Sequence, residues 1–202
     1  MDEFLKIEYE QCMELLKYYD GRQISLARFA TAISAAVASV IFGVNDLRTE
    51  VSENYWGFVA LLSCVTALGL TTIYLGMVQN RLYFVYPARQ VNWIRKVMLD
   101  RLGEQARGNQ MYTDSTFGAF RLRSAHSLAN LFVCLQVGIF VALSVFALGS
   151  QAGRSEFLFL ISTLVGVVGA SVLFGASARY LVVHGRRHPD ERVSGIGTIK
   201  TP

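Results

Sequence analysis

Residues 125–148 read AHSLANLFVCLQVGIFVALSVFAL and contain no Asp, Glu, Lys or Arg. As an α-helix this stretch would be about 36 Å long, more than the ~30 Å hydrocarbon core of a bilayer. Three further apolar blocks are comparable in length: Ile24–Val44, Trp56–Val78 and Phe157–Ala178. The sequence therefore predicts an all-α fold, a four-helix transmembrane bundle made of two hairpins.

The placement of charged residues supports four spans. A Lys, Arg or Asp at the centre of a span costs roughly 2.5–3.5 kcal/mol on insertion scales. Only Arg28 falls inside any of the four blocks, and it lies one turn from the start of the first, where its side chain can reach the headgroups. The alternative is a soluble bundle of buried helices, but a chain that is 52% apolar and 17% charged has too little polar surface to cover them.

Lys and Arg residues are distributed asymmetrically along the chain. Seventeen of the 19 lie in the N-terminal, middle and C-terminal segments, while the two short connections contain only Arg48 and Arg154. Because basic residues are retained in the cytoplasm, this predicts a multi-pass inner-membrane protein with both termini cytoplasmic. The net charge of +4 follows from that topology and from attraction to anionic lipid. It does not predict direct binding to nucleic acid.

The two hairpins divide the chain into five expected segments. A cytoplasmic amphipathic helix covers 1–23, the first hairpin 24–78, a cytoplasmic amphipathic helix and loop 79–124, the second hairpin 125–183 and a flexible cytoplasmic tail 184–202. Asp20 and Gly21 can break the first helix before the span. Equally, residues 1–23 can be a direct extension of the first span, and the sequence leaves both alternatives open.

The middle segment carries basic and aromatic side chains. Beyond Pro87 its apolar residues recur at three- and four-residue spacing, which predicts a helix lying on the inner membrane surface or against the N-terminal helix. The residues expected to dock a cytoplasmic protein partner are Arg89, Trp93, Arg95, Lys96 and Arg101.

No catalytic or metal-binding motif is present. The chain contains no HExxH, GxSxG, phosphate-binding Gly-rich loop or Cys-x-x-Cys. Cys12, Cys64 and Cys134 lack paired spacing, and no span contains an acidic residue that could coordinate a coupling ion. We therefore expect a protein that is not an enzyme, with no catalytic residue, cofactor or metal, and we do not expect a coupled transporter.

Three spans contain small or weakly polar residues at four-residue spacing, a pattern that lets helix backbones approach closely. The rows are Ala35, Ser39 and Gly43 in the first span, Ser63, Ala67 and Thr71 in the second, and Ser162, Gly166 and Ala170 in the fourth. Packing within one protomer and packing between protomers explain these rows equally well.

Gln136 is the only amide side chain in the central part of any span. Because an unpaired amide is costly in hydrocarbon, Gln136 should form an interhelical hydrogen bond or face a hydrated cavity. Asn130 and His126 lie nearer the inner end of the same span. The three residues together are candidates for a polar, pore-lining track.

An aromatic, arginine-rich segment follows the first hairpin, with Asn80, Arg81 and Tyr83 and then Ala88, Arg89 and Gln90. Together with the amphipathic N-terminal segment it resembles small prokaryotic membrane proteins of anti-phage systems. These are the SLATT-type effectors and, by its four-span plan, the membrane component of the Kiwa system. The resemblance covers residues 1–110, and the second hairpin departs from the two-span SLATT pattern. It implies self-assembly in the inner membrane and either pore formation or signalling to a cytoplasmic partner.

The sequence favours a homo-oligomeric membrane protein that forms a pore or a sensing element and docks a cytoplasmic protein. The alternative from another class is a membrane anchor that recruits a soluble effector without conducting ions. Gln136 is the first intramembrane position to test in either case.

Overall fold

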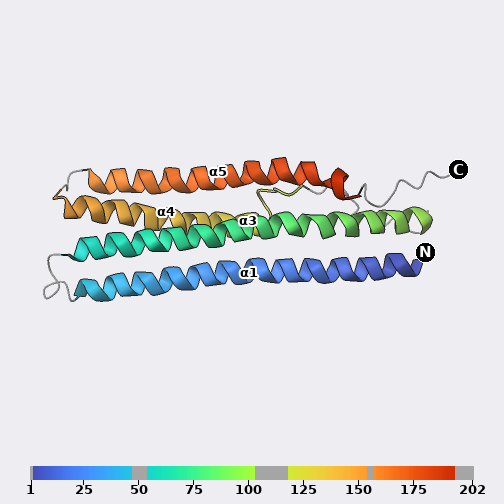
Figure 1. The fold of residues 1–202 in the computed structure, drawn as a ribbon, viewed down its shortest axis with the longest axis horizontal. Coiled ribbons are helices and arrows are strands. Elements are labelled where there is room, and N and C mark those ends of the chain that lie inside the picture. Colours follow the sequence, from blue (N-terminus) through green and yellow to red (C-terminus); the bar gives the residue numbers. More distant parts are fainter. Residues whose placement is uncertain (1, 47–53, 103–117, 154–156, 194–202) are drawn as a thin grey trace. The chain divides into compact units, whose positions relative to one another are not determined.

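The computed structural model describes residues 2–46, 54–102, 118–153 and 157–193. These residues form four helices, α1 (Asp2–Asp46), α3 (Tyr55–Leu102), α4 (Ala125–Gln151) and α5 (Leu158–Val193), with no strand among them (Figure 1). Each helix is long and apolar enough to cross a membrane. The predicted all-α, four-span fold is confirmed. Residues 103–117 of the predicted loop and 194–202 of the predicted tail lie outside the described residues.

The first helix is continuous through Asp20 and Gly21, so residues 2–23 extend the first span. Glycine in a helix interior costs about 1 kcal/mol relative to alanine, a penalty that packing on either side can offset. Tyr19 and Gln23, which flank the glycine, both accept hydrogen bonds from the buried side chain of Asn80. The helix is therefore held to its neighbour at the point where the sequence offered a break.

Helices α3 and α5 also run further than their apolar blocks. Helix α3 passes through Pro87, and α5 continues to Val193, whereas the sequence placed the end of the second hairpin at residue 183. In α5, Leu181 is only 2% exposed, and a Cβ added at Gly185 would overlap the side chain of Ala119. This close packing accounts for helix continuing where hydropathy falls.

Two compact units make up the chain. The apolar unit comprises Ile24–Val78 and Leu122–Ser177, and the polar unit comprises Met1–Gln23, Gln79–Arg121 and Ala178–Pro202. Helices α1, α3 and α5 contribute residues to both units, while α4 belongs to the apolar unit.

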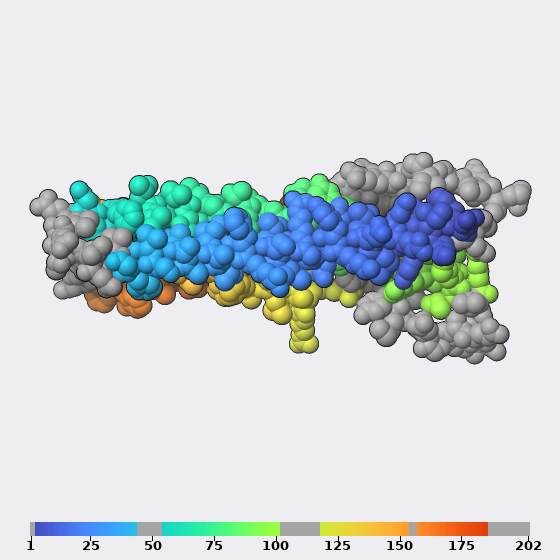
Figure 2. Space-filling view, turned by 90° about the horizontal axis from the view of Figure 1, so that it is seen from below, coloured from blue at the N-terminus to red at the C-terminus, as the bar shows by residue number. Residues whose placement is uncertain are grey.

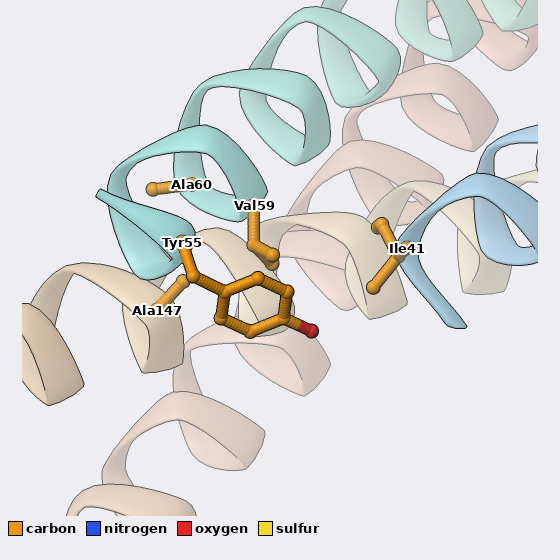
Figure 3. Close-up of a cluster of buried hydrophobic side chains, with 5 residues drawn as sticks. All are labelled: Ile41, Tyr55, Val59, Ala60 and Ala147. Carbon is orange, nitrogen blue, oxygen red and sulfur yellow. The ribbon is translucent and has the colours of Figure 1, made fainter. Parts of the chain in front are cut away.

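In the apolar unit, α1, α3 and α4 meet in a small hydrophobic cluster, formed by Ile41, Tyr55, Val59, Ala60 and Ala147 (Figure 3). The Ser144 hydroxyl donates a hydrogen bond to the carbonyl of Ala60 at 3.2 Å beside this cluster. Helix α4 begins at an N-cap formed by Ser124, whose hydroxyl accepts a hydrogen bond from the Ser127 amide.

Helices α4 and α5 cross in close contact at two glycines. A Cβ built on Gly138 would lie 2.7 Å from the carbonyl oxygen of Gly166, so neither position has room for a side chain. The small-residue row of the fourth span, Ser162, Gly166 and Ala170, is buried in this unit. In the second-span row Ser63 and Ala67 are buried, and Thr71 is half-buried. These two rows therefore serve packing within the protomer.

The row on α1 differs from the other two, because Ala35, Ser39 and Gly43 are all exposed. A Cβ added at Gly43 would meet nothing within 4 Å. Only 11% of the most apolar part of α1 is buried, against 39% for α3 and for α4. Figure 2 shows this part of α1 uncovered on the viewed face.

Candidate functional site

Gln136 forms a polar contact between α4 and α1 in the apolar unit. Its side chain is 8% exposed, and its Oε1 accepts a hydrogen bond from the Ser34 hydroxyl at 2.9 Å. Its Nε2 donates to the Thr31 hydroxyl at 3.3 Å. The Thr31 hydroxyl in turn donates to the carbonyl of Ala27 at 2.9 Å, as threonine commonly does in helices. Of the two environments expected for Gln136, the structure contains the interhelical hydrogen bond.

Asn130 and His126 are buried too, at 4% and 6% exposure, and both interact with neighbouring groups. They lie four residues apart on α4 and so share one face, whereas at about 100° per residue Gln136 points roughly 120° away from Asn130. The structure therefore brings Gln136 to α1 but does not align the three side chains on one line. Whether any of them lines a pore in an assembly stays a prediction.

Tyr74 of α3 is a polar residue that the sequence reasoning missed. The residue is fully buried, and its hydroxyl forms hydrogen bonds with the side chains of Cys134 on α4 and Ser177 on α5. Cys134, which the sequence singled out only for its lack of paired spacing, is thus part of a three-helix polar contact. The position of Tyr74 in the middle of an apolar block could have predicted this contact, because a buried phenol requires a hydrogen-bond partner.

The polar unit has a buried polar cluster of its own. Asn80 Nδ2 donates to the carbonyl of Tyr19 at 2.8 Å and to Gln23 Oε1 at 3.0 Å, which joins α3 to α1. Arg81, 3% exposed, donates from Nε to the carbonyl of Ala119 at 2.9 Å, and its guanidinium lies 5.0 Å from the centre of the Phe84 ring. Asn80 thus holds α1 against α3, and Arg81 holds Ala119 against α3.

The five residues expected to dock a partner have different environments. Arg95 Nη2 donates to the Tyr9 hydroxyl at 2.8 Å, and its guanidinium lies 5.6 Å from the centre of that ring, so Arg95 links α3 to α1. Arg89 is half-buried, and Lys96 and Arg101 are exposed. Trp93 is 46% exposed, a large value for an indole. Arg89, Trp93 and Lys96 follow one another at spacings of four and three, on one side of α3.

In the described ranges, no group of three or more His, Cys, Asp or Glu side chains could hold a metal ion. The three cysteines are free thiols, with Cys64 exposed and the other two buried. His184 stacks on Tyr180, with its Nδ1 3.1 Å from that residue's own carbonyl oxygen.

Comparison of the chain with known proteins gives no match to a family model, to a curated protein or to a solved structure.

Proposed function

We propose that this chain is a non-enzymatic, self-assembling protein of the bacterial inner membrane that acts as a sensing or pore-forming component and makes protein contacts through its polar unit. The observation that carries the proposal is the exposed face of α1. All four helices are apolar enough to span a membrane, and α1 buries 11% of its most apolar part, against 22% for α5 and 39% for α3 and for α4.

Self-association explains the chemistry of that face. Lipid can cover any apolar side chain, whereas small residues in a row favour a second helix, because they let two backbones approach closely. Ala35, Ser39 and Gly43 form such a row on the side of α1 that no other helix of the apolar unit covers.

Mass measurement in lipid nanodiscs tests the proposal directly. Wild-type protein should have a mass of two or more chains of 22.4 kDa each, and Ser39→Leu should shift it toward one chain. Val40→Leu, a substitution at a neighbouring exposed apolar position, is the matched control and should leave the mass unchanged. A wild-type protein that is monomeric at every concentration would contradict self-assembly.

A non-conducting anchor that recruits a soluble effector is the second candidate. It is favoured by Gln136, whose amide is bonded to Thr31 and Ser34 of its own chain instead of facing water. Ion flux through proteoliposomes separates the two functions. Flux that requires the oligomer supports a pore formed between protomers, while absence of flux together with co-purification of a soluble protein supports the anchor.

A role in anti-phage defence is part of the proposal and is supported by the resemblance of residues 1–110 to SLATT-type and Kiwa membrane proteins. Expression in a bacterial host challenged with a panel of phages tests it. Reduced plaque formation that is lost with Ser39→Leu would connect defence with assembly. A fluorescent protein fused to either terminus should fluoresce if both termini are cytoplasmic.

A further inference from the structure

The segment that leads into α4 is fixed between two helices of the polar unit. The carbonyl of Ala119 accepts a hydrogen bond from Arg81 Nε on α3 at 2.9 Å. A Cβ added at Gly185 of α5 would overlap the side chain of Ala119, so the backbone of α5 approaches this residue closely. Ala119 is accordingly only 4% exposed. Residues 118–121 are therefore held in place by α3 and α5, although they form no helix themselves.

This anchored segment ends in an arginine that lies near a buried one. Arg121 follows Ala119 by two residues, and its side chain is exposed. Arg81 is 3% exposed. Burial and then the nearby Arg121 lower the pKa of Arg81 to about 10, and Asp20 of α1 acts in the opposite direction. Arg81 thus stays charged at neutral pH, and two guanidinium groups share their surroundings with one carboxylate.

These three groups have a net positive charge at a place with little water. Like charges repel more strongly there than in bulk solvent, because water screens them less. Asp20 can balance only one of the two guanidinium groups. An anion that contacts the exposed Arg121 would balance the other, and the poorly screened charge of Arg81 would add to the attraction.

The position of the cluster along the helices indicates which anion is available. Asp20 lies four residues before Ile24, where the first apolar block begins. Arg81 lies three residues after Val78, where the second block ends, and Arg121 is near Arg81. At 1.5 Å per residue, Asp20 and Arg81 are about 4.5–6 Å from the apolar blocks. The headgroup layer on each side of a bilayer is about 5–7 Å deep, so the cluster lies at the level of lipid phosphates.

We propose that Arg121 binds the phosphate group of an anionic phospholipid in the headgroup layer, with the buried Arg81 adding to the attraction. Guanidinium and phosphate groups form charge-assisted and often bidentate hydrogen bonds. Basic sites at the cytoplasmic side of transmembrane helices bind lipid headgroups by the same chemistry. The inference rests on the membrane location proposed above, and it does not depend on self-assembly.

General attraction of basic residues to anionic lipid is the alternative to a defined site. Arg179 provides the comparison, because it is an exposed arginine of the polar unit one residue beyond Ala178, the end of the fourth apolar block. General attraction predicts that Arg179 and Arg121 contribute equally, since each has one charge at the level of the headgroups. A site formed with Arg81 predicts a larger contribution from Arg121.

Native mass spectrometry of the full chain tests the site. The protein is released from mixed micelles that contain phosphatidylglycerol and phosphatidylethanolamine, and the lipids that stay bound are counted. Wild-type protein should retain phosphatidylglycerol in preference. Arg121→Gln should weaken this binding about tenfold, the effect of losing one hydrogen bond to a charged group. Arg179→Gln should weaken it less than about twofold at physiological ionic strength, where long-range attraction is screened.

Asp20→Asn is a second variant with the opposite expected effect. It removes the carboxylate that balances one guanidinium group and should strengthen phosphatidylglycerol binding about fivefold, the effect of one unit charge near the headgroups. Circular dichroism of each variant confirms that the helices are intact. Weaker binding by folded Asp20→Asn would contradict the charge argument.

Millimolar inorganic phosphate identifies the source of the phosphate group. If it binds in a manner that requires Arg121, and phosphatidylglycerol is not preferred, the ligand is a soluble phosphate compound and the lipid assignment is wrong. Equal losses in Arg121→Gln and Arg179→Gln would mean general attraction and would overturn the site. An oligomer that retains no phosphatidylglycerol would refute the site alone, whereas a monomer that retains it would refute self-assembly alone.

Discussion

Gln136 on α4 accepts a hydrogen bond from the Ser34 hydroxyl on α1 across a distance of 2.9 Å. The pair is one of the few polar contacts that hold α1 against the other helices of the apolar unit, since most of the apolar surface of α1 is exposed. Its strength bears on both the stability of α1 and the pore hypothesis.

Replacing Gln136 with leucine should lower the free energy of unfolding by about 0.5–2 kcal/mol, the range measured for hydrogen bonds between membrane helices. The loss stays modest because Ser34 and Thr31 keep hydrogen bonds to the carbonyls of Ala30 and Ala27. Unfolding in mixed detergent followed by circular dichroism measures it, with Leu135→Met on the exposed side of α4 as control. Unchanged stability together with altered ion flux would instead favour pore lining.

Gly138→Ala should destabilise the apolar unit by about 1–3 kcal/mol, the usual cost of overpacking. The added Cβ would meet the carbonyl oxygen of Gly166 and force α4 and α5 apart. Gly169→Ala is the matched control, because a Cβ there meets nothing within 4 Å and alanine favours the helix. Equal unfolding midpoints for the two variants would argue against the close crossing.

Tyr74→Phe removes a single hydroxyl from a fully buried site and should cost about 1 kcal/mol. The variant leaves the side chains of Cys134 and Ser177 without their phenolic partner. Tyr83→Phe provides the comparison, since that hydroxyl is exposed and accepts only a 3.4 Å hydrogen bond from Gln79. The same unfolding assay should give a smaller effect for Tyr83→Phe.

Arg95→Lys should loosen the N-terminal part of α1 even though it keeps the charge. Lysine cannot reproduce both the hydrogen bond to Tyr9 and the guanidinium contact with the ring. Backbone hydrogen exchange over residues 2–23 should become faster, whereas Lys96→Arg, at an exposed neighbouring position, should leave it unchanged. In a double-mutant cycle with Tyr9→Phe the two changes should be non-additive, because both disrupt the same contact.

The four spans could be predicted from the sequence because the hydrocarbon core imposes length and charge limits that apply residue by residue. The continuity of α1 through Gly21 could not be predicted in this way. It depends on Asn80, 59 positions away, which donates hydrogen bonds to Tyr19 and Gln23. Local composition at Asp20 and Gly21 is compatible with a break as well as with a helix.

The roles of the small-residue rows could not be assigned from the sequence either. Gly166 and Gly43 occur in the same kind of pattern, yet a Cβ added at Gly166 would overlap Gly138, whereas a Cβ added at Gly43 would meet nothing within 4 Å. Small residues at four-residue spacing show that one face of a helix allows close packing. The spacing does not specify which helix packs against that face. The sequence singles out Gln136 as an amide that needs a hydrogen-bond partner. Its partners on α1 could not be predicted without knowing which helix packs against α4.

The unequal coverage of the helices also ranks them by how firmly they are held. In the apolar unit α5 is fastened to α4 through backbone contact at Gly138 and Gly166, while α1 is joined through a few hydroxyl and amide groups and a small cluster that ends at Ile41. Under partial denaturation or applied force, α1 would detach first. A molecule built in this way has one span that can shift at low cost while the second hairpin keeps its shape.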